Sequence, residues 1–193
     1  MLRAVLSALC LAFALAGCGG GVPKFQLTDV TGADIGREFA LTDHHGQPRT
    51  LQDFRGKVTV IFFGFTHCPD VCPTTLSDFA QVMKALPPAD AARLQVLFVT
   101  VDPERDTREV LAQYVPSFHP SFLGLYGDAE ATARTAKTFK IHYRKQPQPG
   151  GSYTVDHSAG TYIYDAEGRL RLFAQYGAGP QTLLHDICQL LGS

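Results

Sequence analysis

The sequence predicts a single α/β domain whose central sheet is at least partly parallel. Residues 58–63, 95–101 and 122–126 are apolar runs rich in β-branched and aromatic side chains, which is typical of buried strands. Segments with apolar residues at helical spacing alternate with them, and this alternation predicts helices layered on a sheet. A chain of 193 residues that is 45% hydrophobic and 18% charged fits one globular domain. The formal net charge of -1 gives no indication of nucleic-acid binding.

The N-terminal residues predict an export signal followed by a tether. Residues 1–17 carry Arg3 and then an apolar run that is too short to span a bilayer comfortably. The run ends Leu15-Ala16-Gly17-Cys18, which resembles the cleavage box of bacterial lipoproteins, where the cysteine is lipidated. We therefore expect residues 1–17 to be a lipoprotein signal peptide, 18–33 a lipidated tether and 34–193 the folded domain. A retained signal anchor is the alternative, and either one places the domain outside the cytoplasm at a membrane.

Residues 39–51 predict a short hairpin that leads into the first buried strand. Two short strand-like runs flank the turn at Asp43-His44-His45-Gly46. Neighbouring histidines in a turn are usually solvated polar groups, and we expect that here rather than a metal site.

The first buried strand, residues 58–63, runs into two cysteines and then into a helix. Cys68 and Cys72 are separated by three residues, and apolar residues at helical spacing follow them from Leu76 to Leu86. Pro69 suits a first helical turn, and a helix N-terminus favours a thiolate. We therefore expect the two sulfurs to lie about one helical turn apart on one face. They could chelate one soft metal ion or form a disulfide, and the alternative is a pair of core cysteines or a stabilising disulfide.

The middle of the chain continues the alternation of strands and helices. Pro87-Pro88 ends the first helix, and residues 95–101 form the second buried strand. Thr107 and Asp128 are suited to cap helices over 108–115 and 129–139. Right-handed crossovers would bring Cys68 and Asp102 to the same edge of the sheet.

Residues 140–160 interrupt this pattern and contain a candidate ligand. The Pro- and Gly-rich segment 146–152 separates two strand-like pieces and predicts an exposed hairpin near the active edge. His157 follows in a segment of small residues, beside Asp156. Two thiolates and this imidazole would form an S₂N set, which suits copper in either common oxidation state. His67 is the competing donor.

The C-terminal part predicts a β-hairpin over 161–173 and a closing amphipathic helix over 180–191. Cys188 lies on that helix between apolar residues, and we expect it to be in the core.

Three motifs of the chain together resemble those of the SCO/SenC family. They are Gly64–Pro73 (GFTHCPDVCP), Val101–Thr107 (VDPERDT) and Val155–Ser158 (VDHS). The resemblance covers about residues 34–190, and it implies a thioredoxin-like fold, a central mixed sheet flanked by helices, with an inserted hairpin. It also implies copper binding by Cys68, Cys72 and His157.

The resemblance implies a function as well. Family members are metallochaperones or thiol reductants that help to assemble the dinuclear copper centre of cytochrome c oxidase subunit II. Expected partners are this subunit or another copper acceptor, and other periplasmic copper donors. The usual membrane helix of the family is replaced here by the lipoprotein signal with Cys18. We therefore expect a monomeric, membrane-anchored lipoprotein on the periplasmic side of a bacterial cell envelope.

Two enzyme functions remain as alternatives to copper delivery. A thiol-disulfide oxidoreductase could reduce the cysteines of the oxidase copper site through Cys68 and Cys72, although Ser158-Ala159-Gly160 lacks the proline that general reductases of this fold place there. A peroxidase-type enzyme would need only one activated cysteine. In the copper-binding interpretation, Asp156 orients His157 and Asp102 lines the rim of the site.

Overall fold

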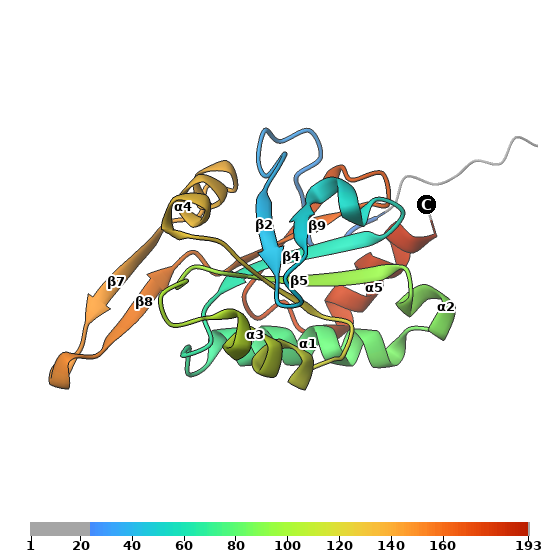
Figure 1. Cartoon of the computed structure of the whole chain (residues 1–193). Helices are drawn as coiled ribbons and strands as arrows, with labels where there is room; N and C mark the ends of the chain where they lie inside the picture. Colours follow the sequence, from blue (N-terminus) through green and yellow to red (C-terminus); the bar gives the residue numbers. More distant parts are fainter. Residues whose placement is uncertain (1–23, 193) are drawn as a thin grey trace, which may run out of the picture.

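The computed structural model describes residues 24–192 and contains an eight-stranded mixed sheet with helices on both faces (Figure 1). The strand order is β1-β10-β9-β4-β5-β6-β2-β3. Strands β4, β5 and β6 are parallel to one another, and the other pairs in this sheet are antiparallel. The predicted α/β class with a central mixed sheet is therefore confirmed.

The bounds of the elements agree closely with the predicted runs. The strands of the main sheet are β1 (Thr28–Asp29), β2 (Ala40–Asp43), β3 (Pro48–Thr50), β4 (Val58–Gly64), β5 (Leu94–Thr100), β6 (Leu123–Tyr126), β9 (Gly160–Tyr164) and β10 (Leu170–Gln175). The helices are α1 (Val71–Ala85), α2 (Pro88–Ala91), α3 (Arg108–Tyr114), α4 (Ala129–Thr138) and α5 (Pro180–Leu191). Short 3-10 turns lie at η1 (Leu51–Phe54), η2 (Val115–Ser117) and η3 (Pro149–Gly151).

The two central strands, β4 and β5, are buried on both faces. Val58, Val60 and Phe62 pack into the core cluster that includes residues of α1, α3 and α5. Ile61 and Phe63 alternate with them and pack on the other face, against α4 and the segment after it. Because successive strand side chains point to opposite faces, an uninterrupted apolar run is what such a position requires.

Both predicted helix caps are present. The Asp128 carboxylate accepts the Ala131 N–H at 2.7 Å at the start of α4. The Thr107 hydroxyl accepts the Val110 N–H at 3.4 Å at the start of α3. These contacts satisfy backbone donors that the first turn of a helix leaves without partners.

The predicted insertion forms a separate two-stranded sheet. Strands β7 (Tyr143–Pro147) and β8 (Tyr153–His157) are antiparallel, with Tyr143 opposite His157. Figure 1 shows this hairpin projecting from one end of the molecule, away from α5. Its position places His157 at the end of β8, where the chain turns back into the main sheet.

The folded domain starts earlier than residue 34. Asp186, a buried carboxylate on α5, accepts the Gln26 N–H at 3.0 Å and the Leu27 N–H at 2.7 Å. Residues Thr28–Asp29 then pair with β10 as an edge strand. Residues 24–33, which we expected to belong to the tether, therefore lie along the domain, whereas residues 1–23 and Cys18 with them are outside the described part.

Two side chains lie elsewhere than predicted. Cys188 is exposed, because the core face of α5 is formed by Leu183, Ile187, Leu190 and Leu191 and Cys188 is turned away from it. His44 is buried rather than solvated, because its Nδ1 accepts the Gly124 N–H at 2.9 Å, while His45 remains exposed.

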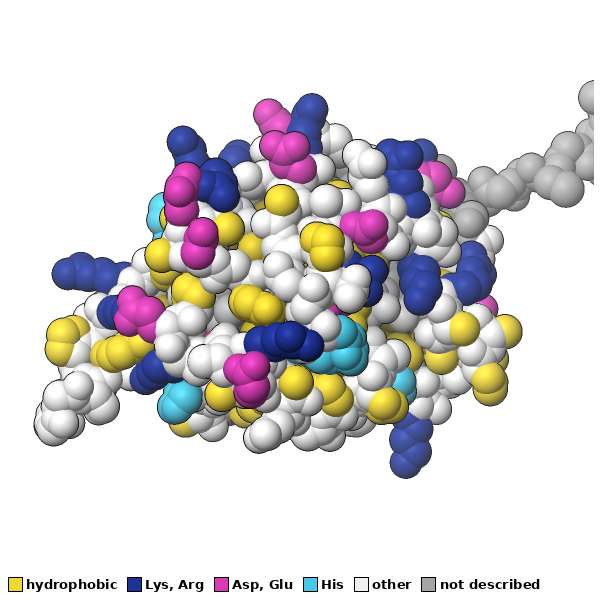
Figure 2. All heavy atoms as spheres, in the orientation of Figure 1, with side chains coloured by type: hydrophobic (Ala, Val, Ile, Leu, Met, Phe, Trp, Pro, Cys, Tyr) yellow, Lys and Arg dark blue, Asp and Glu magenta, His cyan; other side chains and the backbone are white. Residues whose placement is uncertain are grey.

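The described helices include none that is long and apolar enough to cross a membrane. On the face drawn in Figure 2, acidic and basic side chains are interspersed, in keeping with the near-neutral net charge.

Candidate metal centre

The dithiol lies where β4 gives way to α1. Strand β4 ends at Gly64, and the Cys68 N–H donates to the Phe65 carbonyl at 3.2 Å, which closes a turn before the helix starts at Val71. Cys72 is in the first helical turn, whereas Cys68 precedes the helix. The expectation that both lie on one helical face is therefore wrong, and Pro73 rather than Pro69 is in the first turn.

Both cysteines are free thiols, but they differ in burial. Cys68 is half-buried, and Cys72 has no exposed surface. An ideal Cβ built on Gly64 would lie 2.7 Å from Cys72 Sγ and 2.8 Å from Phe98 Cε2, so the sulfur sits directly against the Gly64 backbone. Only a glycine leaves room for the sulfur there.

The environment of Cys72 favours the protonated thiol. Burial raises the pKa of Cys72 well above the ordinary thiol value, and the neighbouring Cys68 raises it further, against a backbone hydrogen bond from Phe65. The predicted lowering by the helix N-terminus is therefore outweighed by desolvation. Replacing the proton by a metal ion is one way to keep the sulfur anionic in this position.

His157 faces Cys72. Its Nε2 lies 3.9 Å from Cys72 Sγ, although the two residues are 85 positions apart in the chain. Its Nδ1 lies 3.0 Å from the Ser158 carbonyl, which can only accept, so Nδ1 carries the proton and Nε2 presents a lone pair. Burial lowers the pKa of His157, which keeps the imidazole neutral, as a metal ligand must be.

The structure brings the three predicted ligand residues to one place without forming a finished site. In residues 24–192, no three His, Cys, Asp or Glu side chains already form a group close enough to hold a metal ion. Cys72 Sγ and His157 Nε2 lie 3.9 Å apart, and the neighbouring Cys68 raises the pKa of Cys72. Two sulfurs and one imidazole nitrogen are a donor set that suits Cu(I).

The turn after β5 holds the dithiol segment in place. Asp106 is buried, and it accepts the Thr66 N–H at 3.0 Å, the Thr66 hydroxyl at 2.6 Å and the Thr100 hydroxyl at 2.6 Å. Burial raises the pKa of Asp106 against these three hydrogen bonds. The carboxylate therefore fixes the residue two positions before Cys68.

The same turn also holds the hairpin that carries His157. Asp102 accepts the Tyr153 hydroxyl at 2.8 Å and Arg105 Nε at 2.5 Å. Arg105 Nη1 donates to the Tyr153 carbonyl at 2.7 Å, and its guanidinium lies 3.7 Å from the centroid of the Tyr153 ring. We call these three residues the hairpin clamp. Asp102 is fully buried, so the predicted role at the rim is wrong.

Asp156, expected to orient His157, and His67, the competing donor, make other contacts. Asp156 accepts Gln146 Nε2 at 2.8 Å and is exposed, so the group that hydrogen-bonds to His157 is the Ser158 carbonyl. The side chain of His67 is 55% exposed, with Nδ1 3.2 Å from the Thr66 hydroxyl. Sequence reasoning missed Asp106, Arg105 and Tyr153 as supports, although two of them lie in the quoted motif 101–107.

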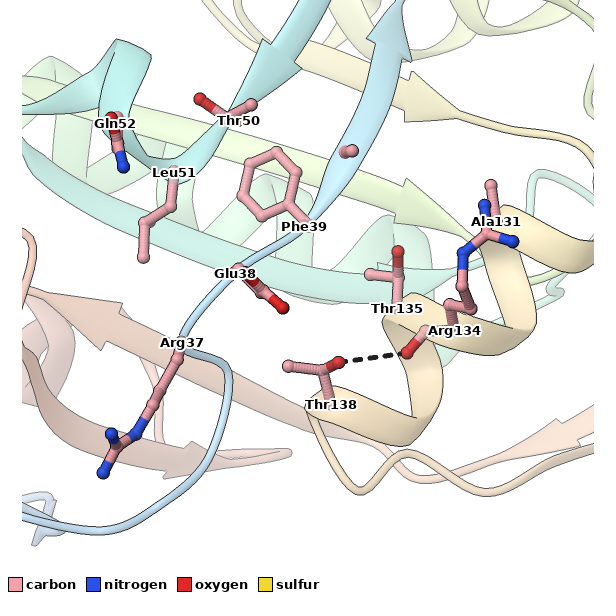
Figure 3. Close-up of a pocket in the computed structure, with 11 residues that line it drawn as sticks. Arg37, Glu38, Phe39, Thr50, Leu51, Gln52, Ala131, Arg134, Thr135 and Thr138 are labelled. Atoms are coloured by element: carbon pink, nitrogen blue, oxygen red, sulfur yellow. Dashed lines mark hydrogen bonds between the residues drawn. The ribbon is translucent and has the colours of Figure 1, made fainter.

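A separate hollow of about 490 Å³ lies between β2, η1 and α4, away from the dithiol (Figure 3). Phe39 and Leu51 lie on one side of it, and Arg134, Thr135 and Thr138 on the other. It has no sulfur or imidazole in its lining, so it offers no site for a soft metal ion. A second groove runs along the hairpin, and His157 lies in its lining together with His142, Asp156 and Ser158.

A family comparison matches most of the chain. The family model described as SCO1/SenC matches residues 28–192. The mitochondrial SCO2 homologue of Mus musculus is 43% identical over 141 residues, which is 72% of this chain and 54% of that protein. The chain thus spans about half the length of the curated relatives it matches.

Solved structures share the fold over nearly their whole length. ScoI of Bradyrhizobium japonicum, solved with copper bound, is 38% identical with a TM-score of 0.74, and the match covers 81% of this chain and 99% of that one. Apo Sco1 of Thermus thermophilus is 42% identical with a TM-score of 0.78, over 89% of this chain and 99% of that one. These matches confirm the thioredoxin-like fold class that the motifs implied.

Proposed function

The chain belongs to the SCO1/SenC family, and from this we propose that it is a copper carrier that binds one copper ion through Cys68, Cys72 and His157. The observation that carries the proposal is the approach of His157 Nε2 to Cys72 Sγ at 3.9 Å with its lone pair directed to the sulfur. The copper-bound structure of a relative at 38% identity supports the choice of metal. The donor set itself is what a soft ion prefers.

Copper delivery would proceed by exchange of ligands. The cysteines lose their protons as the metal ion binds, so affinity should rise with pH. The half-buried Cys68 is the ligand that a thiol of an acceptor can reach, whereas Cys72 is closed in by Gly64 and Phe98. Transfer would therefore start on the Cys68 side. A disulfide between Cys68 and Cys72 would remove both thiolates and stop binding, so the redox state would gate delivery.

We propose further that the acceptor is the dinuclear copper centre of cytochrome c oxidase subunit II and that other periplasmic copper donors load the protein. Membership of the family supports a role in oxidase assembly. The residues 15–18 support attachment to a membrane of the bacterial envelope through a lipid on Cys18, on the periplasmic side. Mass spectrometry of the mature N-terminus tests the lipid anchor independently of copper binding, and transfer of bound copper to a subunit II fragment tests the acceptor.

A titration of the reduced protein tests the copper site directly. We expect Cu(I) and Cu(II) to bind with one ion per chain, and we expect His157→Ala to weaken binding of both, because it removes one of three ligands and leaves both thiols. His142→Ala is the matched control, since His142 is an exposed histidine immediately before the same hairpin. Binding of full strength in His157→Ala would remove His157 from the site.

A thiol-disulfide reductase is the second candidate, and the unequal burial of the thiols favours it. An accessible Cys68 next to a buried Cys72 is the arrangement of an attacking and a resolving thiol. To separate the two functions, reduced protein with and without copper is mixed with an oxidised copper-site fragment of the oxidase. Reduction of the fragment without metal transfer would favour the reductase, and metal transfer to the reduced fragment would favour the carrier.

A further inference from the structure

In the described part of the chain, one buried hydroxyl without a hydrogen-bond partner belongs to a residue that packs against the core cluster containing Cys72. Tyr114 is the last residue of α3, and its Oη is one of three buried side-chain polar atoms without a partner in the described part of the chain. A buried hydroxyl without a partner costs stability, and such groups are rare in folded proteins. Its presence therefore calls for a partner that the copper-free fold does not supply.

The surroundings of Tyr114 place its ring next to the pocket of Cys72. Its ring centroid lies 5.8 Å from that of Phe98, and Phe98 is the side chain that flanks the Cys72 sulfur at Gly64. Tyr114 and Cys68 both pack against the core cluster that contains Cys72. Burial raises the pKa of Tyr114, and Cys72 and Cys68 raise it further.

A bound copper ion would leave cysteine thiolates in this region that a hydrogen-bond donor could stabilise. Metal binding converts both thiols into thiolates, and Cys72 has no exposed surface, so solvent water does not reach its sulfur. Hydrogen bonds to charged acceptors are stronger than those between neutral groups, and groups around the ligands tune the affinity of a metal site. A phenol hydroxyl is a suitable donor, because it can rotate toward a sulfur that has lost its proton.

Resting on the proposed function, we propose that Tyr114 is a positioning residue of the copper site, whose hydroxyl donates a hydrogen bond to a cysteine thiolate when copper is bound. The hydroxyl would then be without a partner in the copper-free protein and satisfied in the loaded one. Removing the hydroxyl should therefore lower the affinity for copper without lowering the stability of the copper-free protein. A residue with only a structural role would change stability and copper affinity in the same direction.

The variant Tyr114→Phe removes the hydroxyl and keeps the ring. We expect its affinity for Cu(I), measured by competition with a chromogenic chelator, to fall by about ten-fold or more. The sulfur-to-Cu(II) charge-transfer band should shift as well, because a thiolate loses a donor. The melting temperature of the copper-free variant should equal or exceed that of the wild type, since the lost hydroxyl makes no hydrogen bond there.

Tyr164→Phe is the matched control. The Tyr164 hydroxyl donates to the Gly36 carbonyl at 2.7 Å and lies in the other core cluster. This variant should have a lower melting temperature and unchanged copper affinity. Equal copper affinity and an identical charge-transfer band in wild type and Tyr114→Phe would overturn the inference, as would a loss of affinity that comes with a lower melting temperature. If the wild type binds no copper, the proposed function fails and this inference fails with it.

Discussion

At the scale of single residues, Gly64 decides how closely the strand and the first helix approach. The glycine ends β4, and Cys72 Sγ occupies the space that any larger residue would need for its Cβ. Gly64 has no side chain that could bind a metal ion, so its effect on the site is steric. The position of Cys72, a proposed metal ligand, therefore depends on the lack of a side chain at Gly64.

We expect Gly64→Ala to displace the Cys72 sulfur and to weaken copper binding, in addition to an overpacking cost of about 1–3 kcal/mol in the free energy of unfolding. Urea denaturation and a Cu(I) competition titration measure the two effects. Gly127→Ala is the control for crowding alone, because its Cβ would lie 2.8 Å from Ala131 Cβ and 3.0 Å from Leu41 Cδ2, in contact with neither cysteine. Equal copper affinity in the two variants would contradict this prediction.

The residue types and spacings indicated all three proposed ligands, but they could not indicate their burial. A Cys-x-x-x-Cys pair at a strand-to-helix junction is visible in the sequence. The desolvation of Cys72 depends on Gly64 and Phe98, which lie outside this motif and approach the sulfur only in the folded protein. For the same reason the helix dipole alone gave the wrong direction for the pKa of Cys72. Cys188 shows a related limit, since one residue along a helix turns a side chain by about 100°.

At the scale of elements, the turn that follows β5 connects the two halves of the site. Its Asp106 holds Thr66, ahead of Cys68, and its Asp102 and Arg105 hold Tyr153, at the start of the strand that ends at His157. The distance between His157 and Cys72 is therefore set by a third segment that contains neither residue. The hairpin clamp makes a two-stranded ribbon, which is marginally stable by itself, into a fixed arm.

We expect Tyr153→Phe to loosen this arm. The substitution removes the hydroxyl that donates to the Asp102 carboxylate and leaves the ring under the Arg105 guanidinium, at a cost of about 1–2 kcal/mol in the free energy of unfolding. Copper affinity should also fall, and the nitrogen coupling in the electron paramagnetic resonance spectrum of the Cu(II) form should weaken, because His157 lies four residues further along β8.

Lys145→Gln serves as the comparison for the clamp. Lys145 forms an ion pair with Glu104, so it joins the same hairpin to the same turn, but both side chains are largely exposed and such pairs contribute little. A spectrum of Tyr153→Phe that matches those of wild type and Lys145→Gln would mean that the clamp does not position His157.

Most elements could be predicted from local patterns because they are encoded locally. The apolar runs of β4 and β5, the helical spacing from Leu76 and the caps at Thr107 and Asp128 all lie within a few residues of the structure they specify. The hairpin clamp could not be predicted in this way, since its contacts join residues 48 and 51 positions apart. Single-sequence periodicity contains no information about such pairs.

At the scale of the whole molecule, three histidines, one buried and two half-buried, link stability to pH. Burial is the largest cause that lowers the pKa of His44, His119 and His157 below the ordinary value of 6.5. As the pH falls below 6.5, the unfolded chain therefore takes up protons on these groups before the folded protein does. The stability that they contribute is complete above the unfolded pKa and is lost as the pH falls toward the lowered folded values.

We expect the free energy of unfolding of the copper-free protein to decrease between about pH 7 and about pH 5, a range that lies above most carboxylate titrations. His44→Asn should reduce this decrease, since an amide oxygen can replace Nδ1 as the acceptor of the Gly124 N–H without taking up a proton. Urea denaturation at a series of pH values measures the slope. His142→Gln, at an exposed position, should keep the slope of the wild type, and an unchanged slope in His44→Asn would contradict the assignment.

The anchorage of residues 26 and 27 on Asp186 has a consequence for how the molecule meets others. The described chain enters the domain beside α5, and the hairpin with His157 projects from the other end (Figure 1). If the protein is tethered at this entry point, the site next to the hairpin lies at the end farther from the tether, and rotation about the tether moves it through a large volume. Its chance of meeting a stationary recipient would then depend on the length of the tether and the long dimension of the domain together.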